Sequence, residues 1–314
     1  MFTDASRICV RCRVAICAIR VYSSVVSILE AHRQHPRRWE SFKYVYPVLS
    51  RRSHGISVGI NTNPDKGCNF DCIYCQVDRT TPATVTEFDL AVAEEELRAM
   101  LTMEFAKHPP FDAVAAEKLR LNDIALSGDA EPTTLRNFSA TIEMIARVKP
   151  RGVKIVLITD AGGLDRADVK RGLEIMDAND GEVWAKLDAG TEEYCKLVNR
   201  TKIPFARILR NITAAAKVRP IIIQSLFMKI QGEGPSADEI TAYCRRLKEI
   251  GNTCPAPGGV KLVQVYTLAR KAMTVVDGLP AWQFVTALSD TEVDAITERV
   301  RREAVVPAES FYGD

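Results

Sequence analysis

From about residue 56 onward, short apolar runs alternate with amphipathic stretches, and this alternation limits the choice of fold more than any other feature. Six apolar runs predict β-strands, namely Ile56–Ile60, Leu121–Leu126, Val153–Ile158, Val183–Leu187, Ile221–Met228 and Val260–Tyr266. The stretches between them predict helices over Phe88–Met103, Ser139–Val148, Arg166–Met176, Ala206–Ala216 and Ala237–Ile250. Continuous apolar runs are typical of parallel strands buried on both faces. Right-handed crossovers would curl six such units into an α/β fold, an open, partial (β/α)6 barrel with its ligands at the carboxyl ends of the strands.

The segments on either side of this body differ from it. Residues 1–54 carry ten Lys or Arg and three acidic residues, whereas the rest of the chain carries 32 basic and 37 acidic residues. We therefore expect a basic N-terminal extension over 1–54, the barrel over 55–270 and a C-terminal helical tail over 271–314. Within the tail, Ser289–Arg302 has the pattern of one amphipathic helix with a capping residue at its start. A body dedicated to nucleic-acid binding is usually basic, and this one is acidic.

The cysteine content and the first residues bear on the compartment. Nine cysteines in 314 residues are too few for a disulfide scaffold, and no signal peptide is evident, so we expect a cytoplasmic chain with reduced thiols. The apolar run Val14–Ile19 is far shorter than a membrane span, and no membrane partner is expected. Residues 1–35 are rich in Arg and Cys, which leaves three interpretations open. They are an extension from an upstream start codon, an organellar transit peptide, or ligands for a second cluster on Cys9, Cys12 and Cys17.

Three cysteines follow the first predicted strand with the spacing Cys68-x3-Cys72-x2-Cys75. Thiolates this close together, on a loop rich in Gly, Pro and Asn, are suited to binding a soft metal. An ordinary four-iron cluster takes four cysteines, so three would leave one iron open to another ligand. The alternative is zinc, which takes a closed set of four ligands, and no matching Cys or His pair lies nearby in the sequence.

A second polar motif, Ser127–Thr133, directly follows the second predicted strand. In a parallel barrel this loop lies on the same rim as the cysteine loop. Gly128 permits a close approach of backbone, Pro132 fixes the local conformation and Glu131 supplies a carboxylate for a cationic amino group.

Together these two motifs resemble those of the radical S-adenosylmethionine (SAM) superfamily. The cysteine spacing, with Tyr74 before the last cysteine, matches that family's cluster motif, and Gly128–Pro132 is similar to its Gly-Gly-Glu-Pro motif. Asp129 and Ala130 stand where glycines are often seen. The resemblance implies a [4Fe–4S] cluster on the three cysteines, SAM as cosubstrate and a flavodoxin- or ferredoxin-like electron donor. It also implies that the loop from Gly128 to Glu131 holds the methionine amino group of SAM and that Tyr74 borders the adenine.

Within that superfamily, four segments resemble a group that includes the wyosine (tRNA imidazoguanine) synthases. These segments are Asp188-Ala189, Lys196–Arg200, Gln264–Tyr266 and Leu288–Asp290. Wyosine synthases hold a second cluster on three widely spaced cysteines just upstream of the first, and residues 18–67 contain none. The sequence therefore favours an unidentified peptide or small-molecule substrate, with a tRNA-modifying enzyme and a non-catalytic iron–sulfur or zinc protein as alternatives.

Other polar and aromatic residues allow two interpretations each. Lys186 and Asp188 lie two apart on a predicted strand and so point to one face, where they bind ribose or substrate, or form an ion pair at the rim. The basic run 33–52 has four aromatic residues interleaved, which contact RNA or pack against the barrel, and we favour packing. Those residues are Trp39, Phe42, Tyr44 and Tyr46. The remaining cysteines, Cys195, Cys244 and Cys254, form no cluster motif and are expected to be buried as small apolar residues.

Overall fold

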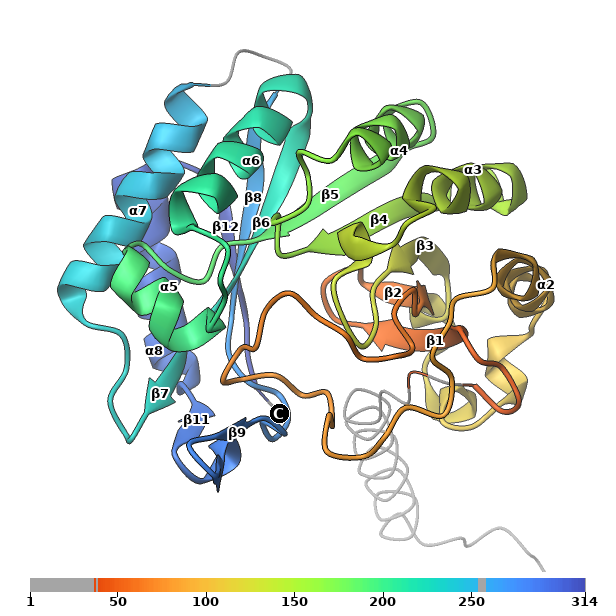
Figure 1. The fold of residues 1–314 in the computed structure, drawn as a ribbon, viewed down its shortest axis with the longest axis horizontal. Coiled ribbons are helices and arrows are strands. Elements are labelled where there is room, and N and C mark those ends of the chain that lie inside the picture. Colours follow the sequence, from red (N-terminus) through yellow and green to blue (C-terminus); the bar gives the residue numbers. More distant parts are fainter. Residues whose placement is uncertain (1–36, 38, 254–257, 314) are drawn as a thin grey trace, which may run out of the picture.

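An eight-stranded sheet curls into a half-barrel, with helices on its convex side (Figure 1). The structure, a computed structural model, describes residues 37, 39–253 and 258–313. The strand order is β1-β2-β3-β4-β5-β6-β8-β12, and every neighbouring pair is parallel except β1 with β2. The strands are β1 (Val45–Ser50), β2 (Gly55–Ile60), β3 (Leu121–Leu126), β4 (Lys154–Thr159), β5 (Gly181–Lys186), β6 (Pro220–Leu226), β8 (Gly259–Tyr266) and β12 (Ala308–Phe311).

The six predicted strands are β2 to β6 and β8, and the parallel partial barrel expected from the sequence is confirmed. The main helices are α2 (Leu90–Leu101), α3 (Phe138–Val148), α4 (Ala167–Asp177), α5 (Glu192–Asn199), α6 (Phe205–Val218), α7 (Ala237–Asn252) and α8 (Asp290–Arg299). All of them except α5 were predicted. Among the described residues, no helix is long and apolar enough to cross a membrane.

Both edges of the sheet come from segments that the sequence placed outside the barrel. β1 lies within 1–54, and β12 lies within 271–314, where only a helical tail was expected. β1 contains Pro47, which an edge strand tolerates because one side of its backbone needs no partner. β12 has four residues, too few to show a pattern. The tail also holds three two- or three-residue strands, β9 (Val275–Val276), β10 (Leu279–Pro280) and β11 (Val285–Ala287), of which β11 pairs with β7 (Met228–Ile230).

The helix expected at Ser289–Arg302 is present. α8 begins with a capping box between Ser289 and Glu292 and continues as a π-turn over Val300–Ala304. It packs beside β12 and places that strand against β8.

The two sides of the sheet are packed differently. On the convex side, Val58, Ile124 and Leu157 belong to one large buried cluster with Leu97 of α2 and Ile142 of α3. On the concave side, a much smaller cluster is formed by Ala125, Val156, Trp184 and Ile222. The segment 61–89, between β2 and α2, crosses this concave side (Figure 1). The helices therefore cover the convex side of the half-barrel, and the concave side leaves room for a cavity.

Candidate functional site

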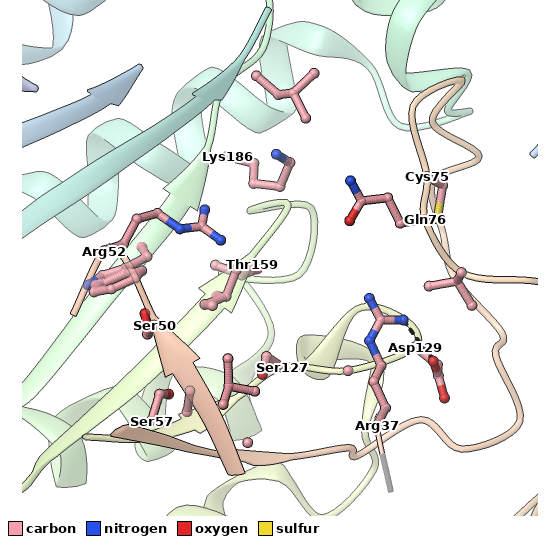
Figure 2. A pocket seen from close by; sticks show the side chains of 18 of the residues that line it. Arg37, Ser50, Arg52, Ser57, Cys75, Gln76, Ser127, Asp129, Thr159 and Lys186 are labelled. Carbon is pink, nitrogen blue, oxygen red and sulfur yellow. Dashed lines mark hydrogen bonds and ion pairs between the residues drawn. The ribbon is translucent and has the colours of Figure 1, made fainter. Parts of the chain in front are cut away.

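A cavity of about 360 Å³ lies on the concave side of the sheet, where both predicted motifs meet. Cys68, Cys72 and Cys75 line it from the segment after β2, and the loop from Gly128 to Glu131 lines it from the segment after β3. Lys186 at the end of β5 lies at the cavity wall (Figure 2). Tyr266 at the end of β8 also lines the cavity. The expectation that these loops share one rim is thus met by the geometry of the described residues.

The cysteine loop is anchored through its backbone. The N–H of Asp71 donates to the carbonyl of Asn199 at 3.1 Å, and the N–H of Ile73 donates to the carbonyl of Val198 at 2.9 Å. Both acceptors lie at the end of α5. At the other end of the cysteine loop, the N–H of Met273, in the segment after β8, donates to the carbonyl of Cys75 at 2.7 Å. α5 and the segment after β8 therefore hold the three thiols at the edge of the cavity.

The donor set suits a multi-iron group better than one metal ion. All three thiols are half-buried and line the same cavity. Burial raises the pKa of Cys68 to about 11 and that of Cys72 to about 12, so metal binding must displace protons. In the described part of the chain, no three His, Cys, Asp or Glu side chains converge on one ion position, as a closed zinc site requires. Cysteines that bind different irons of one cluster do not need to converge in this way.

The loop after β3 is pinned to the end of β2. A Cβ on Gly128 would lie 2.4 Å from Oδ1 of Asn61, and Gly128 has a φ of 152°, so both space and backbone favour glycine. The Asn61 side chain donates to Asp129 Oδ2 at 2.7 Å and accepts from the Asp129 N–H at 3.1 Å. Asp129 also forms an ion pair with Arg37 at 2.7 Å. The sequence did not identify Asn61 or Arg37 as parts of this site.

Glu131 joins the loops that follow β3 and β4. Its Oε1 accepts from the N–H of Thr133 at 3.0 Å and from the hydroxyls of Thr133 and Thr159 at 2.6 Å each. Its Oε2 accepts from the N–H of Asp160 at 2.7 Å. Burial raises the pKa of Glu131, and these four donors oppose that rise. Three of the four bonds end on Oε1, so Oε2 keeps acceptor capacity on a side chain that lines the cavity.

Asp160 is a further acidic residue of the cavity that the sequence did not reveal. One of its oxygens accepts from the N–H of Gly162 at 2.7 Å, and the other, Oδ2, is buried without a hydrogen-bond partner among the described residues. Burial, followed by the nearby charge of Glu131, raises the pKa of Asp160 well above its ordinary value. The signal available in the sequence was its position directly after a predicted strand, on the same rim as Glu131.

Lys186 lies over two aromatic rings inside the barrel. Its Nζ is 5.2 Å from the ring centres of both Tyr74 and Tyr266, and it donates to the hydroxyl of Tyr266 at 2.7 Å. It also pairs with Asp188 at 3.2 Å. Burial lowers the pKa of Lys186, but Asp188 and Tyr266 outweigh that effect and the pKa lies above its ordinary value. Lys186 is therefore a protonated cation held in place at the cavity wall.

Asp188 lies behind Lys186 and is not among the residues that line the cavity. Its carboxylate accepts from the hydroxyl of Tyr74, from the Asn199 side chain at 3.0 Å, from the Leu226 N–H at 2.9 Å and from Lys186. Through these bonds Asp188 holds Tyr74 and Lys186 in place, and its binding to ribose or substrate stays a prediction. The ion pair with Lys186 that the sequence allowed is present.

The remaining described residues singled out by the sequence pack into the fold, and one of them, Tyr46, also lines the cavity. Tyr44 and Tyr46 are buried, and Trp39 and Phe42 pack partly buried against the core, which agrees with the preferred packing interpretation. Cys195 and Cys244 are buried as expected. The cysteines Cys9, Cys12, Cys17 and Cys254 lie outside the described residues.

Comparisons with known proteins agree with these motifs. The family model described as the radical SAM superfamily matches residues 62–244, which is more than half of the chain. A UPF0026 protein of Methanocaldococcus jannaschii is 30% identical over 154 residues, covering 49% of this chain and 43% of the relative. A UPF0026 protein of Helicobacter pylori is 23% identical over 214 residues, covering 65% and 61%. The match thus spans about half of the length of these curated relatives.

Two solved structures have similar folds. TYW1 with a lysine–pyruvate adduct bound has a TM-score of 0.53 and 14% identity, over 80% of this chain and 74% of that chain. Spore photoproduct lyase complexed with dinucleoside spore photoproduct has a TM-score of 0.53 and 10% identity, over 87% and 80%. At these identities the likeness concerns the fold alone.

Proposed function

Because the chain belongs to the radical SAM superfamily, an enzyme family that uses SAM and an iron–sulfur cluster, we propose that it cleaves SAM reductively at a [4Fe–4S] cluster. The resulting 5′-deoxyadenosyl radical would act on an unidentified peptide or small-molecule substrate. The observation that carries this proposal is that Cys68, Cys72 and Cys75 line one cavity together with Glu131.

The described residues fit this pair of cofactors. The three thiols would ligate three irons, and no other cysteine among the described residues lines the cavity, which leaves a coordination position for SAM. When bound, the cluster and SAM supply one-electron cleavage of the sulfonium bond to give methionine and the radical. Oε2 of Glu131 and the partnerless Oδ2 of Asp160 are acceptors suited to the ammonium group of SAM.

Other residues would orient SAM and the substrate. The backbone from Gly128 to Ala130 approaches the cavity closely, because Asn61 holds this loop against β2. We assign Tyr74 to the border of the adenine and Lys186 to ribose or substrate oxygens. The curled sheet and the cysteine loop would exclude bulk water from the radical.

A flavodoxin- or ferredoxin-like protein would supply the electron. The acidic body of the chain and the burial of Tyr44 support a small substrate over RNA, because this ring is not available to stack on bases.

The test is SAM cleavage by anaerobically reconstituted, dithionite-reduced protein, measured as 5′-deoxyadenosine. We expect the parent to form it and a variant with all three motif cysteines changed to Ala to form none. Cys244→Ala, at a buried cysteine of α7 outside the cavity, is the matched control and should retain activity. Iron-loaded parent protein that releases no 5′-deoxyadenosine would overturn the proposal.

A further inference from the structure

One wall of the cavity is rich in arginine. Arg51 and Arg52 line it from the turn between β1 and β2, and Arg270 lines it from the segment after β8. Arg51 donates to the carbonyl of Tyr312, just beyond β12, so this turn connects the two edges of the open sheet. Figure 2 shows the Arg52 side chain directed into the cavity. These arginines therefore come together only because the sheet curls.

Cationic side chains outnumber the carboxyl groups along the cavity lining, and two of these cations have a carboxylate partner outside it, Lys186 with Asp188 and Arg79 with Asp71. Six cationic side chains line the cavity, namely Arg37, Arg51, Arg52, Arg79, Lys186 and Arg270. Four carboxyl groups face them, those of Asp123, Asp129, Glu131 and Asp160. Burial raises the pKa of three of these acids, Asp123, Glu131 and Asp160.

The positive charge that has no carboxylate partner among the described residues lies on two arginines, Arg52 and Arg270. Arg37 pairs with Asp129 at 2.7 Å, whereas no carboxylate of the described residues pairs with Arg52 or Arg270. The guanidinium carbon of Arg52 lies 4.8 Å from the ring centre of Tyr266. Nε of Arg270 is buried and has no hydrogen-bond partner in the described structure. A buried donor without an acceptor is costly, so its position indicates a ligand.

The charges around Arg270 also favour a ligand at this position, and an anionic one. Burial and the neighbouring guanidinium groups of Arg37, Arg51 and Arg52 lower the pKa of Arg270 to about 10. Like charges held this close together repel one another, and an anion between them would relieve the repulsion.

The proposed cofactors do not provide this anion. A [4Fe–4S] cluster with three thiolates is anionic, and SAM, with a sulfonium, an ammonium and one carboxylate, is cationic. Bound together, they add little net charge to the cavity. The excess at Arg52 and Arg270 is therefore left for the second substrate.

We infer that Arg52 and Arg270 bind a phosphate group of the substrate, which makes the substrate a phosphorylated small molecule. This inference rests on the proposed function and names the substrate class for the same cavity. A phosphate monoester carries close to two negative charges at neutral pH, which matches two uncompensated guanidinium groups better than a single carboxylate does. The planar fork of arginine also fits phosphate oxygens in pairs.

The test uses the full-length, cluster-loaded protein under anaerobic conditions with SAM present. Inorganic phosphate is titrated by calorimetry, and acetate serves as the monocarboxylate probe. We expect phosphate to bind more tightly than acetate, and Arg52→Gln and Arg270→Gln each to weaken phosphate binding by about tenfold or more. Arg171→Gln, at an exposed arginine that pairs with Asp168 on α4, is the matched control and should bind phosphate as the parent does.

SAM affinity is measured on the same variants, because the carboxylate of SAM is the competing ligand. If SAM displaces phosphate, or if both glutamine variants lose SAM affinity as strongly as phosphate affinity, the arginines belong to SAM and the inference is wrong. A parent protein that cleaves SAM but binds no phosphate refutes the inference alone. A parent that binds phosphate through these arginines but cleaves no SAM refutes the proposed function alone.

Folding is checked by iron content and thermal melting. If Arg270→Gln does not fold, Arg52→Lys and Arg52→Gln decide, because the charge of Arg52 is what binds phosphate. Lysine should restore part of the phosphate affinity, and equal affinity in both variants and the parent would contradict the inference.

Discussion

Changing Glu131 to Gln tests whether this carboxylate serves SAM or only the loops around it. The amide keeps the shape of the side chain and one acceptor oxygen, which can retain the three bonds that now end on Oε1. The amide nitrogen then replaces Oε2 and faces the N–H of Asp160, which loses its acceptor. The change therefore removes the negative charge and one buried hydrogen bond.

The lost hydrogen bond lowers the folding stability, whereas the lost charge lowers the affinity for SAM, so the two effects are measured separately. Leaving the Asp160 N–H without an acceptor costs about 1–3 kcal/mol of folding free energy, which lowers the melting temperature by a few degrees. Losing a charge-assisted bond to the SAM ammonium costs about 1.5–3 kcal/mol of binding free energy, or roughly tenfold to a hundredfold in affinity. Glu131→Ala is less informative, because it leaves four donors without an acceptor and threatens the fold itself.

The assay is SAM titration and iron analysis on the same folded protein, well below its melting temperature. Thr133→Val is the matched control, since it removes one hydroxyl bond to Oε1 but leaves the charge in place. We expect both variants to lose stability and to assemble the cluster, and only Glu131→Gln to lose SAM affinity by about tenfold or more. If Glu131→Gln binds SAM as tightly as Thr133→Val does, Glu131 only holds the two loops together and our placement of the SAM amino group is wrong.

Three further predictions concern the cluster, the backbone and acid stability. Anaerobically purified parent protein should contain about four iron atoms per chain, and changing all three motif cysteines to Ala should remove them; retained iron would refute the cluster assignment. Gly128→Ala should lower thermal stability and SAM affinity, because its Cβ would overlap Asn61, and an unchanged melting curve would show that this loop adjusts freely. Burial raises the pKa of Glu182, but Lys154 and Lys261 outweigh it and hold that pKa at about 2, below its ordinary value of 4.5. The charged Glu182 therefore stabilises the fold above about pH 4.5, and this stabilisation is lost as the pH falls toward 2. In denaturant unfolding, Glu182→Gln should be less stable than the parent at pH 6, and the difference should vanish near pH 2.

Much of the fold was predictable because each central strand is a continuous apolar run. β3 begins and ends at the residues predicted from its apolar run, and β5 begins two residues and ends one residue before the predicted bounds. Buried parallel strands need continuous apolar runs, and such runs are visible without any knowledge of their partners. β1 also has an apolar run, but it contains Pro47 and lies in the basic segment that we expected outside the barrel, and β12 has only four residues. α5 was missed because its eight residues are too few for a clear helical period.

The site was predictable where a motif spans neighbouring residues. The cysteine loop and the Glu131 loop each have a local pattern, and both line the cavity. Asn61 and Asp160 have no such pattern, because the two bonds of Asn61 to Asp129 and the free oxygen of Asp160 are placed only after β2, β3 and β4 are side by side. A polar residue at the carboxyl end of a parallel strand is the most that the sequence shows of such positions.

The origin of the cavity wall suggests how the chemistry is divided along the chain. The cysteine loop and the Glu131 loop belong to the central strands, which the radical SAM family model matches. Arg52 lies before the matched residues 62–244, and Arg270 lies after them. The residues assigned to the radical-forming cofactors are thus those of the family, and the arginines that we assign to the phosphate lie outside it, one in the turn after the edge strand β1 and one after β8. Turns and loops can vary without disturbing the parallel core, so this division agrees with the proposal that these arginines select the substrate.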